Sequence, residues 1–308
     1  MTYYLGIDVG GTSIKGGVVS EDGNVIFKAV AKVKNDALDA LNCVMENVMQ
    51  YCDKNGINVK KCGIGVPCIF DKKTGVVSYG NNLDFKGVNL KEWVKSRYGK
   101  ELFISNDAAA AALGEYRFGA GKGYDNVVLI TIGTGVGCGI IIDGKIISSN
   151  SSAVGELSHT VVNLGGRKCS CGNKGCLEAY CSMTALYKDV RREMLKNKKS
   201  KMWHTLNVED IDGREYFSLL GKDESADKVF SRFINYLGVG VLNVANLLRP
   251  DVIIIGGGVS AQGDVIIKPL NEYLSARLFA KEYTQSVCAV CAKNGNDAGI
   301  LGAAALAM

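Results

Sequence analysis

Three cysteines lie close together in one short, glycine-containing stretch. Cys169, Cys171 and Cys176 occur in RKCSCGNKGCLEAY (167–180) with the spacing C-x-C-x4-C, and Glu178 follows them. Thiols this close form disulfides in an oxidising compartment and metal sites in a reducing one. The chain has 11 cysteines, an odd number that does not fit a complete disulfide framework. We therefore expect a cytoplasmic protein with a metal ion at this cluster.

Histidine is the other side chain here that commonly ligates a metal. The chain has two, His159 and His204. A lone histidine is more often a hydrogen-bonded structural residue, but His159 stands ten residues before Cys169, which favours metal ligation. His204 lies in KMWHTLN, which carries no motif, and we expect it on the surface or in a loop.

The remaining cysteines include several in apolar or regular stretches, where a thiol is typical of a small core residue. On this basis we expect core positions for Cys43, Cys62, Cys138 and Cys288.

Glycine-rich turns offer a second kind of chemistry. YYLGIDV (3–9) leads into GGTS, a second strand pattern (14–20), a DG turn and a third strand pattern (25–32). Backbone without Cβ atoms can approach a ligand closely and point its N–H groups at phosphate oxygens. One such turn is typical of an ordinary hairpin. The strands that follow also exclude a Walker or Rossmann motif, in which a helix follows the turn.

The same arrangement occurs again in VVLITIGTGVGCGIIIDGKII (127–147). Asp8-Val-Gly-Gly-Thr aligns with Thr131-Ile-Gly-Thr-Gly, and EDGNVI aligns with IDGKII. One unit used twice, about 120 residues apart, indicates two related domains, and its paired turns favour a split phosphate clamp.

Other segments supply the elements that would position these groups. Apolar periodicity predicts a helix within 35–56 that stops at Gly56, KKCGIGVP predicts a strand ending at Pro67, and ELFISND predicts a strand running into an alanine-rich helix. DVIIIGGGVS (251–260) predicts a buried strand and a helix from about Lys268. Its glycines are either the floor for a nucleotide base or an ordinary strand-to-helix turn.

Composition limits the class of protein. The chain has 308 residues, 47% of them hydrophobic and 22% charged, enough for one large core or two moderate ones. There is no signal-peptide pattern, and the apolar runs are too short to span a bilayer. The net charge of +5 is dispersed, and KNKKSK (196–201) is typical of a helix end or solvated loop, so neither membrane nor nucleic acid is expected as a partner.

Taken together, the motifs resemble those of the ROK family of sugar kinases and related repressors, which has the actin-like ATPase fold. The resemblance runs nearly end to end and rests on these segments: DVGGTSIKGG (8–17), GVP (65–67), NNL (81–83), ND (106–107), TIGTGVGCG (131–139), GELSH (155–159), CSCGNKGCLE (169–178), GGG (256–258) and GNDAGILGAA (295–304).

This resemblance implies an α/β fold of two actin-like (ribonuclease H-like) domains with a ligand cleft between them. We place the boundary within Gly114–Gly123 by the repeat. This gives an N-terminal domain 1–115, completed by a C-terminal helix (297–308), and a C-terminal domain 116–296.

The resemblance also implies a structural zinc ion on His159, Cys169, Cys171 and Cys176. Three thiolates and one imidazole form a closed tetrahedral shell without an open position for catalysis.

In the family, the residues that match Glu156, His159 and Glu178 hold the sugar hydroxyls near C1 and C2. Asp107 matches the catalytic base, which accepts the proton of the 6-hydroxyl, and the same Ser-Asn-Asp sequence also suits a helix cap. The other sugar-binding matches are Gly65, Asn82 and Asn106.

For ATP and Mg²⁺, the matching residues lie in the three glycine-rich segments. They are Asp8, Gly10, Gly11, Thr12, Lys15, Thr131, Gly133, Thr134, Gly135, Gly256, Gly257 and Gly258. Asp8 is the candidate for organising Mg²⁺ through water, and the second choice for the base.

The resemblance implies a homodimeric, ATP-dependent kinase that phosphorylates glucose at the 6-hydroxyl. Cys68, Phe85 and Ser158 depart from the family pattern near the expected sugar pocket. Allose, mannose, fructose, N-acetylmannosamine, N-acetylglucosamine and β-glucosides therefore remain alternative substrates. The rival function is a non-catalytic, sugar-responsive regulator. The repressors carry an N-terminal helix-turn-helix domain, for which the hairpin at Asp8 leaves no room.

Overall fold

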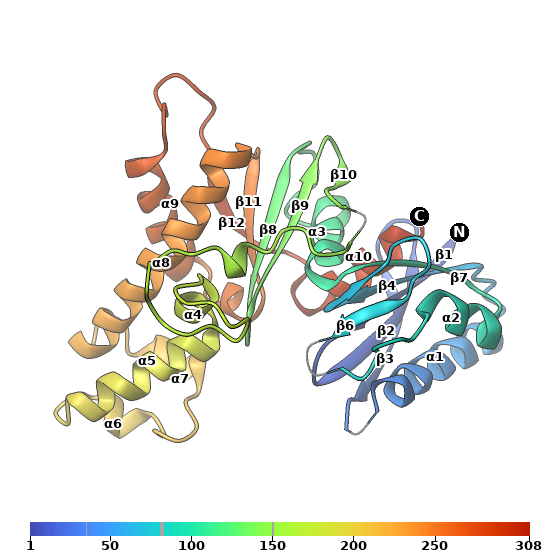
Figure 1. Cartoon of the computed structure of the whole chain (residues 1–308), viewed down its shortest axis with the longest axis horizontal. Helices are drawn as coiled ribbons and strands as arrows, with labels where there is room; N and C mark the ends of the chain where they lie inside the picture. The colour runs from blue at the N-terminus through green and yellow to red at the C-terminus, as the bar shows by residue number, and fades with distance from the viewer. Residues whose placement is uncertain (35, 81–82, 150) are drawn as a thin grey trace. The chain divides into compact units, whose positions relative to one another are not determined.

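Two sheets of the same design organise the computed structural model, which describes residues 1–34, 36–80, 83–149 and 151–308 (Figure 1). In the described residues, each is five-stranded: the orders are β3-β2-β1-β4-β7 and β10-β9-β8-β11-β12. Numbered by their order in the chain, the strands of both sheets follow the pattern third, second, first, fourth, fifth. The duplication predicted from the two glycine hairpins is thus confirmed over whole sheets.

The first sheet contains the expected meander and two parallel strands. Its members are β1 (Tyr3–Val9), β2 (Ser13–Ser20), β3 (Val25–Lys32), β4 (Lys61–Val66) and β7 (Glu101–Asn106). β1, β2 and β3 pair antiparallel, whereas β1, β4 and β7 pair parallel. A small two-stranded sheet, β5 (Cys68–Phe70) and β6 (Val77–Gly80), follows β4.

Three helices accompany this sheet: α1 (Ala37–Lys54), α2 (Leu90–Tyr98) and α3 (Asp107–Phe118). α1 begins where the side chain of Asp36 accepts a hydrogen bond from the backbone N–H of Leu38, and it ends just before Gly56, as predicted. Its buried apolar face, which includes Leu41 and Met45, packs against β2 and β3 and contributes to the hydrophobic core of this part of the chain.

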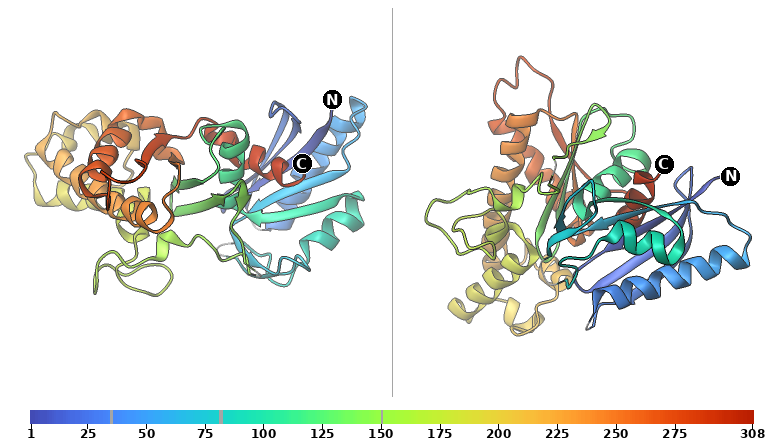
Figure 2. Two further views of the ribbon diagram at one scale, coloured as in Figure 1. Left: turned by 90° about the horizontal axis from the view of Figure 1, so that it is seen from above. Right: turned by 45° about the vertical axis from the view of Figure 1, so that its right-hand side comes forward.

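A helix at the end of the chain, α10 (Ala298–Leu306), packs against β1, β4 and α3. The contact depends on glycine: a Cβ atom on Gly63 or Gly302 would lie 1.7 Å from a carbonyl oxygen of the neighbouring element. Both ends of the chain therefore lie in the same part of the molecule (Figure 2).

The second sheet contains β8 (Val127–Ile132), β9 (Val136–Ile142), β10 (Lys145–Ile146), β11 (Val252–Gly256) and β12 (Cys288–Cys291). The helices of this part of the chain are α4 (Glu178–Cys181), α5 (Met183–Lys196), α6 (Met202–Thr205), α7 (Gly213–Ser218), α8 (Glu224–Leu248) and α9 (Asp264–Arg277). Short 3-10 turns occur at Leu157–His159, Gly258–Gln262 and Gly295–Asp297.

The chain forms two compact units. Unit 1 contains Met1–Leu129, Cys138–Gly155 and Ala292–Met308, and unit 2 contains Ile130–Gly137 and Glu156–Cys291. This division passes within β8 and β9, whereas residue 115 lies inside α3. The compact units therefore differ from a simple cut of the chain after residue 115.

Three expectations about local structure are wrong. Cys43 and Cys288 are exposed, whereas Cys62 and Cys138 are buried. Cys43 lies on the outer face of α1, and Cys288 begins β12, which lies at an edge of its sheet. α9 starts at Asp264, four residues before Lys268, because a 3-10 turn and Gly263 connect it closely to β11.

Within the part of the chain that the structure describes, no helix is both long and apolar enough to cross a membrane. His204 lies exposed in α6, in agreement with the surface position expected for it.

Candidate active site and metal centre

The first group of predicted residues gathers at one edge of the first sheet. β1, β4 and β7 run parallel, so their carboxyl ends meet there. Asp8 pairs with Gly65 on β4, and Gly65 pairs with Ser105 on β7. Asn106 ends β7 and Asp107 begins α3. In α/β sheets this edge is where ligands bind.

Asn106 and Asp107 have different local roles. The Oδ1 atom of Asn106 caps α3 by accepting hydrogen bonds from the N–H groups of Ala108 (3.0 Å) and Ala109 (3.2 Å). Asp107 follows in the first turn, where the helix dipole favours an ionised carboxylate. The cap expected from Ser-Asn-Asp is thus made by Asn106.

Gly65 and Cys68 are neighbours of Asp107 within unit 1. A Cβ atom at Gly65 would lie 3.3 Å from the Cα atom of Asp107, so the absence of a side chain lets the strand and helix approach. Burial, followed by the charge of Asp107, raises the pKa of the Cys68 thiol to about 12. Cys68 is therefore a neutral, buried neighbour of the carboxylate at neutral pH.

Asp8 and Lys15 face each other across β1 and β2. Their carboxylate and ammonium groups are 3.8 Å apart. Burial raises the pKa of Asp8, and the positive charge of Lys15 partly opposes that rise. Between these strands the N–H of Gly10 donates to the carbonyl oxygen of Ser13 (3.0 Å), which closes the turn that contains Gly11 and Thr12. The arrangement has the charge and exposed backbone that a phosphate or hydrated Mg²⁺ would need.

The corresponding turn of unit 2 follows Thr131 at the end of β8. The N–H of Gly133 donates to the carbonyl oxygen of Gly135 (2.9 Å), and Thr134 is exposed at the tip. The third glycine segment, 256–258, follows β11. Gly257 has φ of +77° and lies against the backbone of Ile132, so the two glycine segments are neighbours within unit 2.

His159, Cys169, Cys171 and Cys176 form a cluster in unit 2. Their potential ligand atoms all lie within 4.8 Å of one another. Nδ1 of His159 is 3.7 Å from Sγ of Cys169, and Sγ of Cys171 is 3.7 Å from Sγ of Cys176. This donor set fits a tetrahedral zinc ion. Because Nδ1 faces the thiols, Nε2 lies on the other side of the ring.

The surrounding backbone holds the cysteines in place. The N–H of Cys169 donates to the carbonyl oxygen of Asn173 (2.9 Å), and the N–H of Gly172 donates to the carbonyl oxygen of Cys169 (3.1 Å). Burial raises the pKa of the Cys176 thiol to about 12, whereas a hydrogen bond from the backbone at Asn173 lowers the pKa of Cys171. A bound cation would offset the cost of ionising Cys176.

Two carboxylates flank this cluster. Glu156 is exposed immediately before the 3-10 turn that carries His159, and its carbonyl oxygen accepts a hydrogen bond from the N–H of His159 (3.1 Å). Glu178 begins α4, two residues after Cys176. The predicted sugar-binding residues of unit 2 are therefore assembled on one short metal-type loop.

Comparison with known proteins decides the family. The model of the ROK family matches residues 4–308. The chain belongs to the ROK family.

Individual ROK relatives include both enzymes and regulators. The glucokinase of Thermotoga maritima is 33% identical over 307 residues, which is 98% of this chain and 96% of the relative. The ROK family glucokinase of Streptomyces griseus, solved in complex with glucose and AMPPNP, is 32% identical with a TM-score of 0.86 and 99% coverage of both chains. A ROK family transcriptional regulator, a homologue of the MLC protein of E. coli, is 25% identical with a TM-score of 0.88; the match covers 99% of this chain and 77% of the regulator.

The three residues that depart from the ROK pattern are all buried. Cys68 is 5% exposed, Phe85 is 0% exposed and Ser158 is 4% exposed. Phe85 belongs to the hydrophobic core of unit 1, so its substitution affects packing first. Asn82 lies outside the described residues.

One cluster that supports the metal loop was missed by sequence reasoning. Arg167 donates to both carboxylate oxygens of the buried Asp189 (2.8 and 2.9 Å), and its guanidinium lies over the ring of Tyr180. The hydroxyl of Tyr180 accepts a hydrogen bond from the N–H of Arg167 (2.7 Å). Arg167 lies two residues before Cys169, but nothing in the sequence pairs it with an aspartate 22 residues away.

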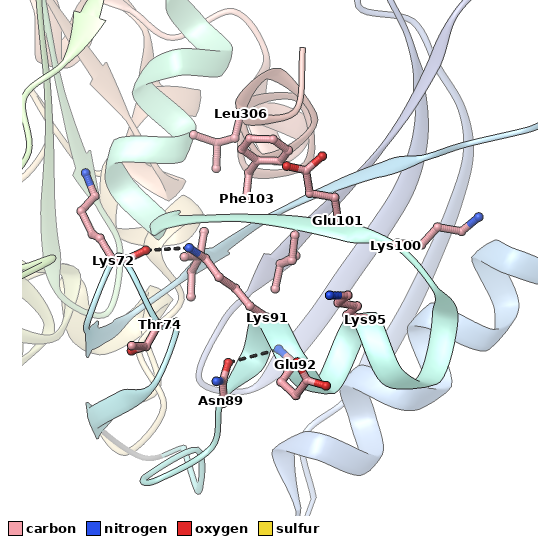
Figure 3. A pocket seen from close by; sticks show the side chains of 12 residues that line it. Lys72, Thr74, Asn89, Lys91, Glu92, Lys95, Lys100, Glu101, Phe103 and Leu306 are labelled. Carbon is pink, nitrogen blue, oxygen red and sulfur yellow. Dashed lines mark hydrogen bonds between the residues drawn. The ribbon is translucent and has the colours of Figure 1, made fainter.

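A pocket of about 540 Å³ in unit 1 lies apart from the predicted site residues (Figure 3). Lys72, Lys91, Lys95 and Lys100 line it, together with parts of β7. The ammonium group of Lys91 already donates to the carbonyl oxygen of Lys72 (2.6 Å), and those of Lys72 and Lys100 point away from each other (Figure 3). The lysines therefore do not converge on a single anion.

Proposed function

We propose that this protein is an ATP-dependent hexose kinase that converts glucose to glucose 6-phosphate. The observation that carries this proposal is the full-length likeness to a ROK glucokinase solved with glucose and AMPPNP. The glucokinase of Thermotoga maritima supports it at 33% identity over almost the whole chain.

In the proposed reaction, Asp107 accepts the proton of the sugar 6-hydroxyl. The 6-oxygen then forms a bond to the γ-phosphorus of ATP, the bond from that phosphorus to the bridging oxygen breaks, and ADP leaves. Asp107 suits this role because it begins a helix, where the dipole favours a negative charge, and the sheet edge that carries Asp8 lies beside it.

Phosphate binding is assigned to the glycine turns of the two units. Gly10, Gly11 and Thr12 would contact the phosphates from unit 1, and Thr131, Gly133, Thr134 and Gly135 from unit 2, with 256–258 beneath the nucleotide base. Asp8 would hold Mg²⁺ through water and Lys15 would balance its charge, in accordance with their separation of 3.8 Å. When bound, Mg²⁺ supplies neutralisation of the charge that develops on the transferred phosphoryl group.

Sugar binding is assigned to Glu156, His159 and Glu178, with Gly65, Asn82 and Asn106 on the side of unit 1. Zinc on His159 and the three cysteines would fix the loop that carries Glu178, and Nε2 of His159 would face a sugar hydroxyl. We place the protein in the cytoplasm, where a cluster of thiols keeps its metal. We further propose a homodimer, which light scattering after gel filtration would test, and two actin-like domains as the folding units.

A sugar-responsive regulator without catalysis is the second candidate. It is favoured by one observation, the TM-score of 0.88 to a ROK transcriptional regulator. A regulator would bind the sugar with no release of ADP, so the same assay separates the two functions.

Coupled measurement of ADP release over a panel of hexoses tests the proposal. Glucose should give the highest kcat/KM, because Glu156, His159 and Glu178 offer hydrogen-bond partners to free hydroxyls at C1 and C2. Fructose and 2-deoxyglucose leave some of these groups unpaired and should be disfavoured. The panel also contains allose, mannose, N-acetylmannosamine, N-acetylglucosamine and a β-glucoside. A tenfold preference for any of these would replace glucose as the substrate, and no ADP release with any hexose would contradict the kinase.

A further inference from the structure

The carboxylate of Glu178 is held at both of its oxygens. Oε2 accepts a hydrogen bond from the backbone N–H of Val136 (3.1 Å), and Oε1 accepts one from the hydroxyl of Ser170 (3.2 Å). Val136 follows the glycine turn of β8–β9, whereas Ser170 lies between Cys169 and Cys171. One side chain thus connects the phosphate-type turn to the metal loop.

Close approach of the turn makes the first of these bonds possible. A Cβ atom on Gly135 would lie 2.7 Å from Oε2 of Glu178. Any side chain at Gly135 would therefore force the carboxylate away from Val136. Glycine in this turn has a second purpose besides exposing backbone to phosphate.

The start of α5 holds the same turn from another direction. The N–H of Met183 donates to the carbonyl oxygen of Gly133 (2.8 Å), and the hydroxyl of Thr184 donates to the carbonyl oxygen of Thr134 (2.8 Å). Thr184 itself is exposed, and its hydroxyl bonds to the turn and not to any predicted sugar-binding residue that the structure describes. These two hydrogen bonds tie the turn, which leads into Val136, to the start of α5.

We propose that Glu178 couples sugar binding to nucleotide binding through the 133–136 turn, with Thr184 and Ser170 as positioning residues. This inference rests on the proposed function. Each carboxylate oxygen has a second lone pair, so Glu178 can accept a sugar hydroxyl while it keeps its present partners. Phosphate binding that orders the turn also orders Val136, and thereby fixes Glu178 in the orientation that the sugar requires.

Coupling of this kind is reciprocal. If the nucleotide increases the affinity for sugar by a certain factor, the sugar increases the affinity for nucleotide by the same factor. Typical coupling factors are about 5–150. The two positioning residues should differ in a measurable way, because Thr184 holds the turn and Ser170 holds the carboxylate from the metal side.

Isothermal titration of glucose, with and without Mg²⁺–AMPPNP, tests the proposal on the zinc-loaded protein. The wild type should bind glucose at least about fivefold more tightly when the nucleotide analogue is present. Thr184→Val, which loses the hydroxyl but keeps the shape, should reduce that factor to below about twofold. Its glucose Kd without nucleotide should stay within about twofold of the wild type. Thr184→Ser keeps the hydroxyl and serves as the matched control, with the coupling retained.

Ser170→Ala provides the contrasting result. It should raise the glucose Kd by about the same factor, roughly three- to tenfold, in both conditions, because one orienting hydrogen bond to Glu178 is lost. Undiminished coupling in Thr184→Val, or a wild-type coupling factor below twofold, would overturn the proposal. Failure of the wild type to bind glucose at all would instead contradict the proposed function.

Discussion

The carboxyl group of Asp8 lies in surroundings that disfavour its charged form. Burial raises the pKa of its carboxyl group, and Lys15, 3.8 Å away, compensates only in part. A pKa raised on folding means that the ionised form is less stable in the native state than in the unfolded chain. Residues of this kind are typical of functional sites, where a charge is kept for chemistry at the expense of stability.

Asp8→Asn should therefore stabilise the protein and impair phosphoryl transfer. The destabilisation of the native state by the Asp8 carboxylate is absent below pH 3.8, where Asp8 is protonated in both the native and the unfolded chain. It develops as the pH rises through the raised native pKa. At pH 7 we expect an increase in Tm of about 1–3 °C. Loss of a group that organises Mg²⁺ should lower kcat by about 10²-fold.

Asp22→Asn is the matched control for this prediction. A hydrogen bond from the Ser20 hydroxyl lowers the pKa of Asp22, so its ionised form favours the native state and the substitution should lower Tm slightly at pH 7. Thermal unfolding of both variants at pH 4 and pH 7 measures the difference. A lower Tm for Asp8→Asn at pH 7 would contradict the assignment of Asp8 as a destabilising charge.

Among the elements, the loop from His159 to Glu178 has little regular structure to hold it. Short stretches of backbone pairing, including Val161 with Cys176, are supplemented by the cluster of Arg167, Tyr180 and Asp189. The cysteine spacing, the position of His159 and the resemblance to the ROK family predicted the ligand set of this loop. Its anchors could not be predicted, because they join residues whose separation in sequence follows no period.

Purified protein should contain about one zinc ion per chain. Cys171→Ala should release it and loosen the loop, which should raise the KM for glucose about tenfold and the KM for ATP less than twofold. Metal analysis by mass spectrometry and steady-state kinetics check this. Cys43→Ala removes an exposed thiol outside the cluster, and it should change neither the zinc content nor the two KM values. Zinc-free protein prepared without chelators, or a disulfide within the cluster, would contradict the metal site.

At the scale of the whole molecule, the duplicated hairpin was the strongest predictor of the fold. Alternation of apolar residues and DG turns predicted six strands in two meanders, and their repetition predicted two related domains. The positions of the fourth and fifth strands of each sheet became known only from the structure. A C-terminal helix was expected to complete the N-terminal domain, and α10 lies in unit 1. The division of β8 and β9 between the compact units could not be predicted, because it depends on long-range contacts that leave no pattern in the sequence. Exposure of Cys43 was missed because its residue type was taken as a sign of burial, whereas the helical spacing of Leu41, Val44 and Met45 places Cys43 on the opposite face of α1.

Asp107→Asn tests the central claim, that the chain transfers a phosphoryl group from ATP to a sugar hydroxyl with Asp107 as the base. The amide keeps the shape of the side chain and can still hydrogen-bond a hydroxyl, but it cannot accept the proton. We expect kcat for glucose to fall by about 10²–10⁴-fold, with the glucose Kd within about threefold of the wild type. The exposed Asp53→Asn should leave both values unchanged. A folded Asp107→Asn variant with near-normal kcat would contradict the account.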